Sequence, residues 1–360
     1  MTERERFLCT MRFQPVDRIP LMEVGVWDET LERWHHEGLP KWVTHLRHLE
    51  DYLGLDRSFN VNWLPIHDRI YPYFERQVVE ETETDQIIRD EVGVLYRQRK
   101  HHKTIPQYLR FPVEDEADYE RLLPRLNGAD PGRYAEDFDE DLHWRRVRGE
   151  IIGLSFEGFF GFPRGLMGVE RWCMAFYDQP QLVRRVIADR LQFAKALLAR
   201  VLATGALDFV QIWEDMAYKT APLIAPRLVR EFMLPAYAEL IAFLRAGGVQ
   251  VIMVDCDGRV DELLPIWLEA GADGTHPCEI AAGSDPLLLR QRHPRAALMG
   301  GLDKRVLVGG REGVDAELCR VEPLWRAGGY IPMLDHFVPP DMPYDLYCYY
   351  VERRRELLSL

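Results

Sequence analysis

The chain has 360 residues, enough for one large domain or two ordinary ones, and its 47% hydrophobic and 29% charged residues are typical of globular proteins with a sizeable core. Its 58 acidic and 45 basic side chains give a formal charge of −13, which offers no electrostatic basis for binding nucleic acid or an anionic membrane. No apolar run approaches the roughly 20 residues that a membrane span needs. Charged residues occur within residues 1–13, where a signal peptide would have its apolar core. We therefore expect a cytoplasmic protein.

An apolar, β-rich run that ends in polar residues recurs along the chain, and a helical pattern usually follows it. This alternation predicts parallel strands joined by crossover helices. Eight such units predict a (β/α)8 barrel, the TIM barrel, for which about 250 residues is typical. A doubly wound sheet is the alternative, but no GxGxxG follows a strand. The expected strands lie at 18–27, 58–63, 150–158, 207–215, 249–258, 272–279, 296–304 and 328–336.

The residues in excess of a simple barrel lie mainly at 66–148. Residues 75–100 alternate apolar and polar side chains around acidic turns, which is typical of an antiparallel ribbon. Residues 105–124 resemble an extended segment that enters a helix. We therefore expect one domain over 1–360, an α/β barrel with an antiparallel β ribbon inserted in one loop.

The first two expected strands end in polar residues, at the face where barrels carry their active sites. Glu23 and Trp27 lie at or after the first strand, and Glu23 could equally form a local salt bridge. Asn60 and Asn62 are two apart in the second strand, so their side chains share a face. Polar groups inside a barrel are costly without partners, which favours a role in substrate binding.

The third and fourth strands end in acidic residues. Glu157 is followed by an aromatic, glycine-rich loop that includes Phe160, which would form the wall of a flat ligand site or simply pack in the core. Glu214 and Asp215 close the fourth strand, and Glu214 is a candidate acid or base. One of two adjacent acids usually points away, and Asp215 could cap the next element.

The fifth strand ends in Asp255-Cys256-Asp257. In extended backbone the two aspartates face the same way, with Cys256 opposite. Two carboxylates on one face suit a divalent metal or a shared proton, and an Asx-type turn is the structural alternative.

Further candidates close the last three strands. His276 and Cys278 have the same spacing as the aspartates, and such a pair alone does not make a zinc site. Asp303 follows two glycines, where backbone can approach a ligand closely. His336 ends the last strand and suits a ligand or a general base.

Three stretches of the chain resemble the uroporphyrinogen decarboxylase superfamily: residues 4–23 (RERFLCTMRFQPVDRIPLME), residues 213–249, and residues 299–310 with 328–344 (MGGLDKRVLVGG and GGYIPMLDHFVPPDMPY). The resemblance implies a (β/α)8 barrel, and the methyltransferase-like branch is the closer match. Authentic decarboxylases carry an Arg-Gln-Ala-Gly-Arg run after the first strand. Here no arginine lies between Arg18 and Arg33, so we do not expect an authentic uroporphyrinogen decarboxylase.

The methyltransferase branch moves methyl groups between a small molecule and a corrinoid or folate. Its zinc-dependent members use His-x-Cys at a strand end and a later Cys, and these positions fall on Asp255, Asp257 and near His336. The thiolate ligands are absent, so the resemblance implies either a metal site with harder ligands, zinc for example, or a metal-free acid/base set.

The leading hypothesis is a methyltransferase that works with cobalamin, carried by a corrinoid protein partner. Alternatives are a decarboxylase or lyase acting on a smaller acid, and a non-catalytic relative that binds a tetrapyrrole or corrinoid. A homodimer is a further expectation. The expected catalytic residues are Glu157, Glu214, Asp255, Asp257 and His336, and the expected substrate-binding residues are Glu23, Trp27, Asn60, Asn62, Phe160, His276, Cys278 and Asp303.

Overall fold

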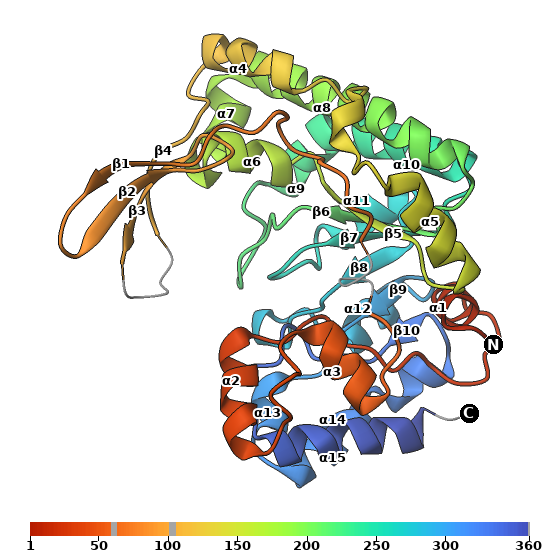
Figure 1. Ribbon diagram of the computed structural model, residues 1–360. Coiled ribbons are helices and arrows are strands. Elements are labelled where there is room, and N and C mark those ends of the chain that lie inside the picture. The colour runs from red at the N-terminus through yellow and green to blue at the C-terminus, as the bar shows by residue number, and fades with distance from the viewer. Residues whose placement is uncertain (59–62, 101–105, 359–360) are drawn as a thin grey trace.

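The computed structural model describes residues 1–58, 63–100 and 106–358. Six parallel strands form one sheet in the order β10-β9-β8-β7-β6-β5 (Figure 1). Most of their residues are buried, as expected for strands covered on both faces. The strands are β5 Gly153–Glu157, β6 Phe209–Trp213, β7 Val251–Asp255, β8 Gly274–His276, β9 Ala297–Met299 and β10 Tyr330–Ile331.

The first two expected strands join the edges of this sheet through isolated bridges. Val26 pairs in parallel with Val338 after β10, and Trp63 pairs in parallel with Gly153 of β5. The backbone N–H of Asp56 donates to the carbonyl of Leu21 at 2.9 Å, which connects these two segments. The α/β fold with eight parallel segments agrees with the predicted TIM barrel, although the first two segments are not regular strands where the structure describes them.

The helices cover the outside of the sheet, and the two termini lie on the same side of the molecule (Figure 1). Several predicted helices are confirmed, among them α8, which begins with proline at its first position, where the missing N–H costs nothing. A π-helical turn, Val229–Met233, joins α9 to α10, and none of the described helices is long and apolar enough to cross a membrane. The α-helices are α1 Glu3–Met11, α2 Asp28–Glu37, α3 Leu46–Leu53, α4 Glu116–Leu122, α5 Phe138–Val147, α6 Gly161–Met167, α7 Val169–Asp178, α8 Pro180–Ala203, α9 Pro226–Leu228, α10 Leu234–Ala246, α11 Leu264–Glu269, α12 Pro286–Arg292, α13 Lys304–Leu307, α14 Arg311–Arg326 and α15 Tyr344–Leu357.

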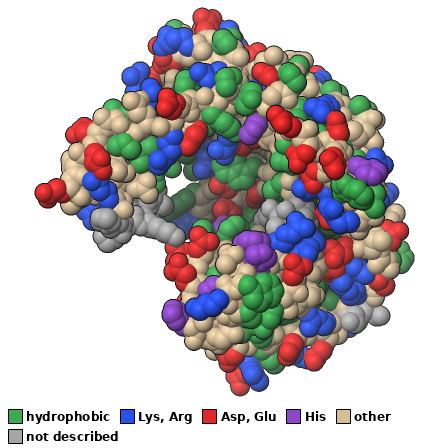
Figure 2. Space-filling view, in the orientation of Figure 1, with side chains coloured by type: hydrophobic (Ala, Val, Ile, Leu, Met, Phe, Trp, Pro, Cys, Tyr) green, Lys and Arg blue, Asp and Glu red, His purple; other side chains and the backbone are tan. Residues whose placement is uncertain are grey.

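The inserted segment forms a four-stranded antiparallel sheet in the order β1-β2-β3-β4, which extends to one side of the molecule (Figure 1). The predicted ribbon at 75–100 supplies three of these strands, β1 Gln77–Glu81, β2 Asp85–Arg89 and β3 Leu95–Arg99. The extended segment that follows supplies β4 Gln107–Arg110 and then α4. The molecule is deeply hollowed between this sheet and the half that holds α2 and α13 (Figure 2).

Candidate active site

A cavity of about 510 Å³ lies at the carboxyl ends of the parallel strands, and we call it the acidic cavity. It brings together five of the predicted site residues from four different parts of the chain. This is the face where barrels of this type place their chemistry. The lining residues are Val24, Trp27, Trp213, Asp215, Asp255, Asp257, His276, Pro277, His336 and Phe337.

Asp255 is the most deeply placed carboxyl of this cavity. Its Oδ2 accepts a hydrogen bond from the Gln211 amide at 2.6 Å, and its Oδ1 lies 3.9 Å from Nδ1 of His276. Burial raises the pKa of Asp255 well above its usual range, and the nearby Asp257 and Asp215 carboxyls raise it further. Burial also lowers the pKa of His276 to about 3, so this imidazole is neutral near pH 7 and does not neutralise Asp255 by charge.

Asp257 stands nearer the opening, just beyond the end of β7. Its Oδ2 lies 3.6 Å from Nε2 of His336, and its backbone N–H donates to Asp215 Oδ1 at 3.2 Å. Burial raises the pKa of Asp257 to about 7, with additional repulsion from Asp215 and Glu279. Asp257 can therefore exchange a proton near neutral pH.

Cys256 points away from both aspartates, as the pleat predicts. Its thiol is buried in the core, where Sγ accepts from the Met216 N–H at 3.3 Å. Burial raises the pKa of this thiol well above its usual value, so it is not a thiolate.

An aromatic wall closes the outer side of the acidic cavity. The Trp27 and His336 rings are stacked with centroids 6.0 Å apart, and Trp27 lies 5.0 Å from the Phe337 ring. Trp27 remains 44% exposed, so part of it is accessible to a ligand. Burial and the nearby Lys304 lower the pKa of His336, so the imidazole is mainly neutral at pH 7.

Asp215 belongs to this cavity although it was not among the predicted site residues. It has a left-handed φ of 46°, which turns its side chain into the cavity directly after the end of β6. Its carboxyl lies 3.6 Å from the Arg164 guanidinium, which also donates to the Asp215 carbonyl. The adjacent acids Glu214-Asp215 were the available signal, but the sequence did not tell which one faces the cavity.

The predicted metal set does not fit the arrangement of these side chains. Asp257 lies beside His336, whereas Asp255 is directed to Gln211 and His276. Across the part of the chain that the structure describes, no three or more His, Cys, Asp or Glu side chains are grouped to hold a metal ion. The donor set instead suits carboxyl groups that carry protons.

Glu214, predicted as an acid or base, has a structural position in the core. Its Oε1 accepts from the Phe159 N–H at 2.8 Å and the Tyr237 hydroxyl at 2.5 Å, and its Oε2 accepts from Phe160 at 2.6 Å and Gly161 at 2.8 Å. The first N–H groups of a helix lack intrahelical partners, and a carboxylate there also complements the helix dipole. Glu214 thus supports α6, where the sequence predicted a loop.

Two predicted substrate-binding residues form ion pairs instead, one of them fully buried and the other with an exposed arginine. Glu23 is fully buried and pairs with Arg354 of α15, while it accepts from the Leu334 N–H at 3.3 Å. Asp303 caps α13 and forms a two-bond pair with Arg305, at 2.9 and 2.7 Å. Both carboxylates are occupied by these contacts and do not line the acidic cavity.

The remaining predicted residues divide between the core and other regions. Phe160 and Cys278 are buried and do not line the acidic cavity, because Phe160 packs in the hydrophobic core and Cys278 lies behind the strand ends with a φ of 59°. Asn60 and Asn62 lie outside the described residues. Glu157 lines a second cavity.

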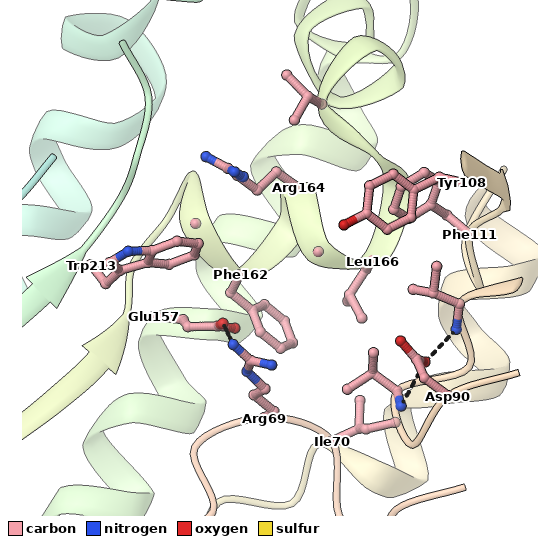
Figure 3. A pocket seen from close by; sticks show the side chains of 15 residues that line it. Arg69, Ile70, Asp90, Tyr108, Phe111, Glu157, Phe162, Arg164, Leu166 and Trp213 are labelled. Atoms are coloured by element: carbon pink, nitrogen blue, oxygen red, sulfur yellow. Dashed lines mark hydrogen bonds and ion pairs between the residues drawn. The ribbon is translucent and has the colours of Figure 1, made fainter. Parts of the chain in front are cut away.

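This second cavity, of about 390 Å³, lies between the inserted sheet and α6, and we call it the apolar cavity (Figure 3). Glu157 forms an ion pair with Arg69 at its base, and burial raises the pKa of Glu157 to about 7. Trp213 lines both cavities, so they adjoin along this side chain. The aromatic, glycine-rich segment after Glu157 was a partial signal for this cavity in the sequence.

A barrel-like sheet with an acid-lined cavity at its strand ends is the architecture of a broad class of α/β proteins. The family model described as uroporphyrinogen decarboxylase (URO-D) matches residues 160–357, more than half of the chain, and the chain belongs to this family. The predicted superfamily is therefore confirmed.

Two individual proteins illustrate the relationship. The chain is 28% identical over 251 residues to a uroporphyrinogen decarboxylase of Rhodococcus erythropolis, a match that spans 64% of this chain and 65% of the relative, less than two thirds of its length. It is also similar to the solved structure of a methyltransferase from Methanosarcina mazei, with a TM-score of 0.61 and 15% identity over 99% of both chains. At this identity the structural likeness supports the common fold.

Proposed function

We propose that this chain is a methyltransferase that removes a methyl group from a small methylated compound and passes it to a corrinoid, with Asp257 as the proton donor. The observation that carries the proposal is the acidic cavity, in which Asp257 with a pKa of about 7 borders Asp215, Asp255 and His336. The Methanosarcina mazei structure, described as a methyltransferase, shares the fold along the whole chain and supports this choice within the family.

The reaction needs a proton at a defined atom. When a methyl–oxygen bond breaks, the carbon leaves with the nucleophile and the oxygen keeps the bonding electron pair. A protonated carboxyl beside that oxygen neutralises it as the bond breaks, which contributes typically about 10²–10⁴-fold to the rate. The Asp257 carboxyl faces the cavity and is close to half protonated at pH 7.

The other residues of the acidic cavity would adjust the pKa of Asp257 and supply it with a new proton. Asp255, whose pKa burial raises, keeps its hydrogen bond to Gln211, and the adjacent Asp215 carboxyl raises the pKa of Asp257. His336 Nε2, 3.6 Å from Asp257, would relay a proton from solvent back to Asp257 after each turnover.

The corrinoid would lie at the mouth of the acidic cavity. When bound there in its reduced state, it supplies the nucleophile that accepts the methyl group. Trp27 and Phe337 offer aromatic surface for such a flat ring system. A corrinoid carried by a partner protein is the form that we propose.

Methyl transfer to free cobalamin tests the proposal. Reduced cobalamin, kept anaerobic, is incubated with the protein and a panel of methoxylated and other methylated compounds, and methylcobalamin is followed by its absorption spectrum. We expect formation with at least one compound, and formation about 10²–10⁴-fold slower with Asp257→Asn. An unchanged spectrum with every compound, together with carbon dioxide release from a carboxylated one, would favour a lyase.

Decarboxylation of a smaller acid is the second candidate. Arg69 and Arg164 line the apolar cavity, and guanidinium groups bind carboxylates well. However, Arg69 already pairs with Glu157 and Arg164 with Asp215, so a bound carboxylate would have to compete with these pairs. This competition is the reason we rank methyl transfer first.

A further inference from the structure

The lining of the apolar cavity is suited to a flat hydrophobic group. Tyr108 and Phe111 of the inserted segment face Phe162 and Leu166 of α6 across it, while Trp213 stands at the far side (Figure 3). The Tyr108 and Phe111 rings lie 5.5 Å apart at a tilt of 34°. Binding sites for small molecules are mostly apolar clefts of about 300–1,000 Å³ with a few polar groups, and this cavity falls in that range at about 390 Å³.

The charged groups of the cavity are already paired. Arg69 pairs with Glu157, and Arg164 lies over the Trp213 ring at 5.1 Å while it contacts Asp215. The Asp90 carboxylate accepts from the backbone N–H groups of Val92 at 3.1 Å and Val94 at 2.8 Å. A charged ligand would find no unpaired countercharge among these groups, so the lining favours an uncharged ring with a hydroxyl-type substituent.

The sheet register gives the distance between one lining residue of each cavity. Glu157 pairs with Trp213, and Trp213 pairs with Asp255, so these three residues stand side by side on adjacent strands. At about 4.8 Å between strands, Glu157 and Asp255 are separated by roughly 10 Å. A single ring with a short substituent can span this interval.

We propose that the apolar cavity holds the ring of an uncharged aromatic substrate, whose methyl-bearing atom reaches past Trp213 into the acidic cavity. A cavity of about 150 Å³ is known to accept benzene, so there is room for a substituted ring. The choice of substrate rests on the proposed methyl transfer, but binding of the ring does not.

Gly165 offers a way to fill the cavity without disturbing the fold. It lies in α6, lines the cavity, and a Cβ built there meets no atom within 4 Å. Gly165→Phe therefore places a ring where the ligand would lie. The matched control is Ala199→Phe, an equally bulky change at an exposed position of α8.

Calorimetry with 2-methoxyphenol, in the absence of cobalamin, tests the inference. We expect Gly165→Phe to weaken the binding of 2-methoxyphenol about tenfold or more. Methanol, which has no ring, is the control ligand and should bind no better to the wild type than to this variant. Ala199→Phe should stay within about twofold of the wild type, because distant sites act independently. Tyr108→Ala, at a half-exposed wall of the cavity, is a second variant and should weaken binding by about threefold.

Two results would overturn the inference: 2-methoxyphenol fails to bind the wild type, or it binds Gly165→Phe and Tyr108→Ala as tightly as the wild type. Failure of the proposed function looks different. In that case the ring binds and Gly165→Phe blocks it, yet no methylcobalamin forms in the spectral assay.

Discussion

Replacing Glu214 by glutamine tests whether this buried acid has a structural role. The carboxylate accepts four hydrogen bonds, two at each oxygen, and it is fully buried. A glutamine amide has the same shape, but only one of its two ends accepts hydrogen bonds, while the other donates.

The loss of stability follows from the amide orientation of Gln that keeps more of these hydrogen bonds. With its oxygen toward Phe160 and Gly161, the amide keeps both of these bonds, and its NH2 group can donate to the Tyr237 hydroxyl after that hydroxyl rotates. The Phe159 N–H then faces an NH2 group and loses its acceptor. One buried donor left without a partner costs about 1–3 kcal/mol, so we expect Glu214→Gln to lower the free energy of unfolding by this amount.

Urea denaturation followed by far-ultraviolet circular dichroism measures this loss. Glu83→Gln, at an exposed turn of the inserted sheet, is the matched control and should change stability by less than about 0.5 kcal/mol. If Glu214→Gln is as stable as the wild type and yet inactive, the structural role is refuted and Glu214 returns to the catalytic set.

Four further predictions test other parts of the molecule. With Asp257 as the acid, activity should fall about tenfold per pH unit above pH 7, and this limb should be absent from the residual activity of Asp257→Asn. Because the folded pKa of Asp257 is raised, its contribution to stability is present below about pH 4 and is lost as the pH rises to 7, so Asp257→Asn should raise the melting temperature at pH 8 more than at pH 4. Arg354→Met leaves the buried Glu23 charge unpaired and should cost about 3–5 kcal/mol in urea denaturation. Metal analysis of protein never exposed to chelator should find well under one equivalent of transition metal. The acid/base assignment would be refuted if a full equivalent is bound and the activity depends on it.

The parts of the site that the sequence predicted depend on local geometry. The pleat of β7 places Asp255 and Asp257 on the cavity side and Cys256 in the core, and a side-chain period of two residues is enough to predict this. The strand ends were found because buried parallel strands are continuous apolar runs. Trp27 and His336 follow from the barrel order, which brings the first and last strands together.

The missed features depend on contacts between distant parts of the chain. Glu23 has the sequence context of a cavity residue, but Arg354 comes from the last helix, 331 residues later, and neutralises it. The segment around Gly161 contains glycine and proline, which favour a loop, and it becomes helical because the Glu214 carboxylate, 53 residues later, accepts its first N–H groups. Local patterns carry no information on such pairs.

The adjacent acids at the end of β6 connect the two cavities. The left-handed φ of Asp215 sends its carboxyl into the acidic cavity, while Glu214 points into the core and holds the start of α6. Arg164 of the same helix contacts Asp215, so two neighbouring residues directly after β6 hold α6 at two points. Because α6 also forms a wall of the apolar cavity, Arg164 lines that cavity and at the same time contacts Asp215, the carboxyl that raises the pKa of Asp257.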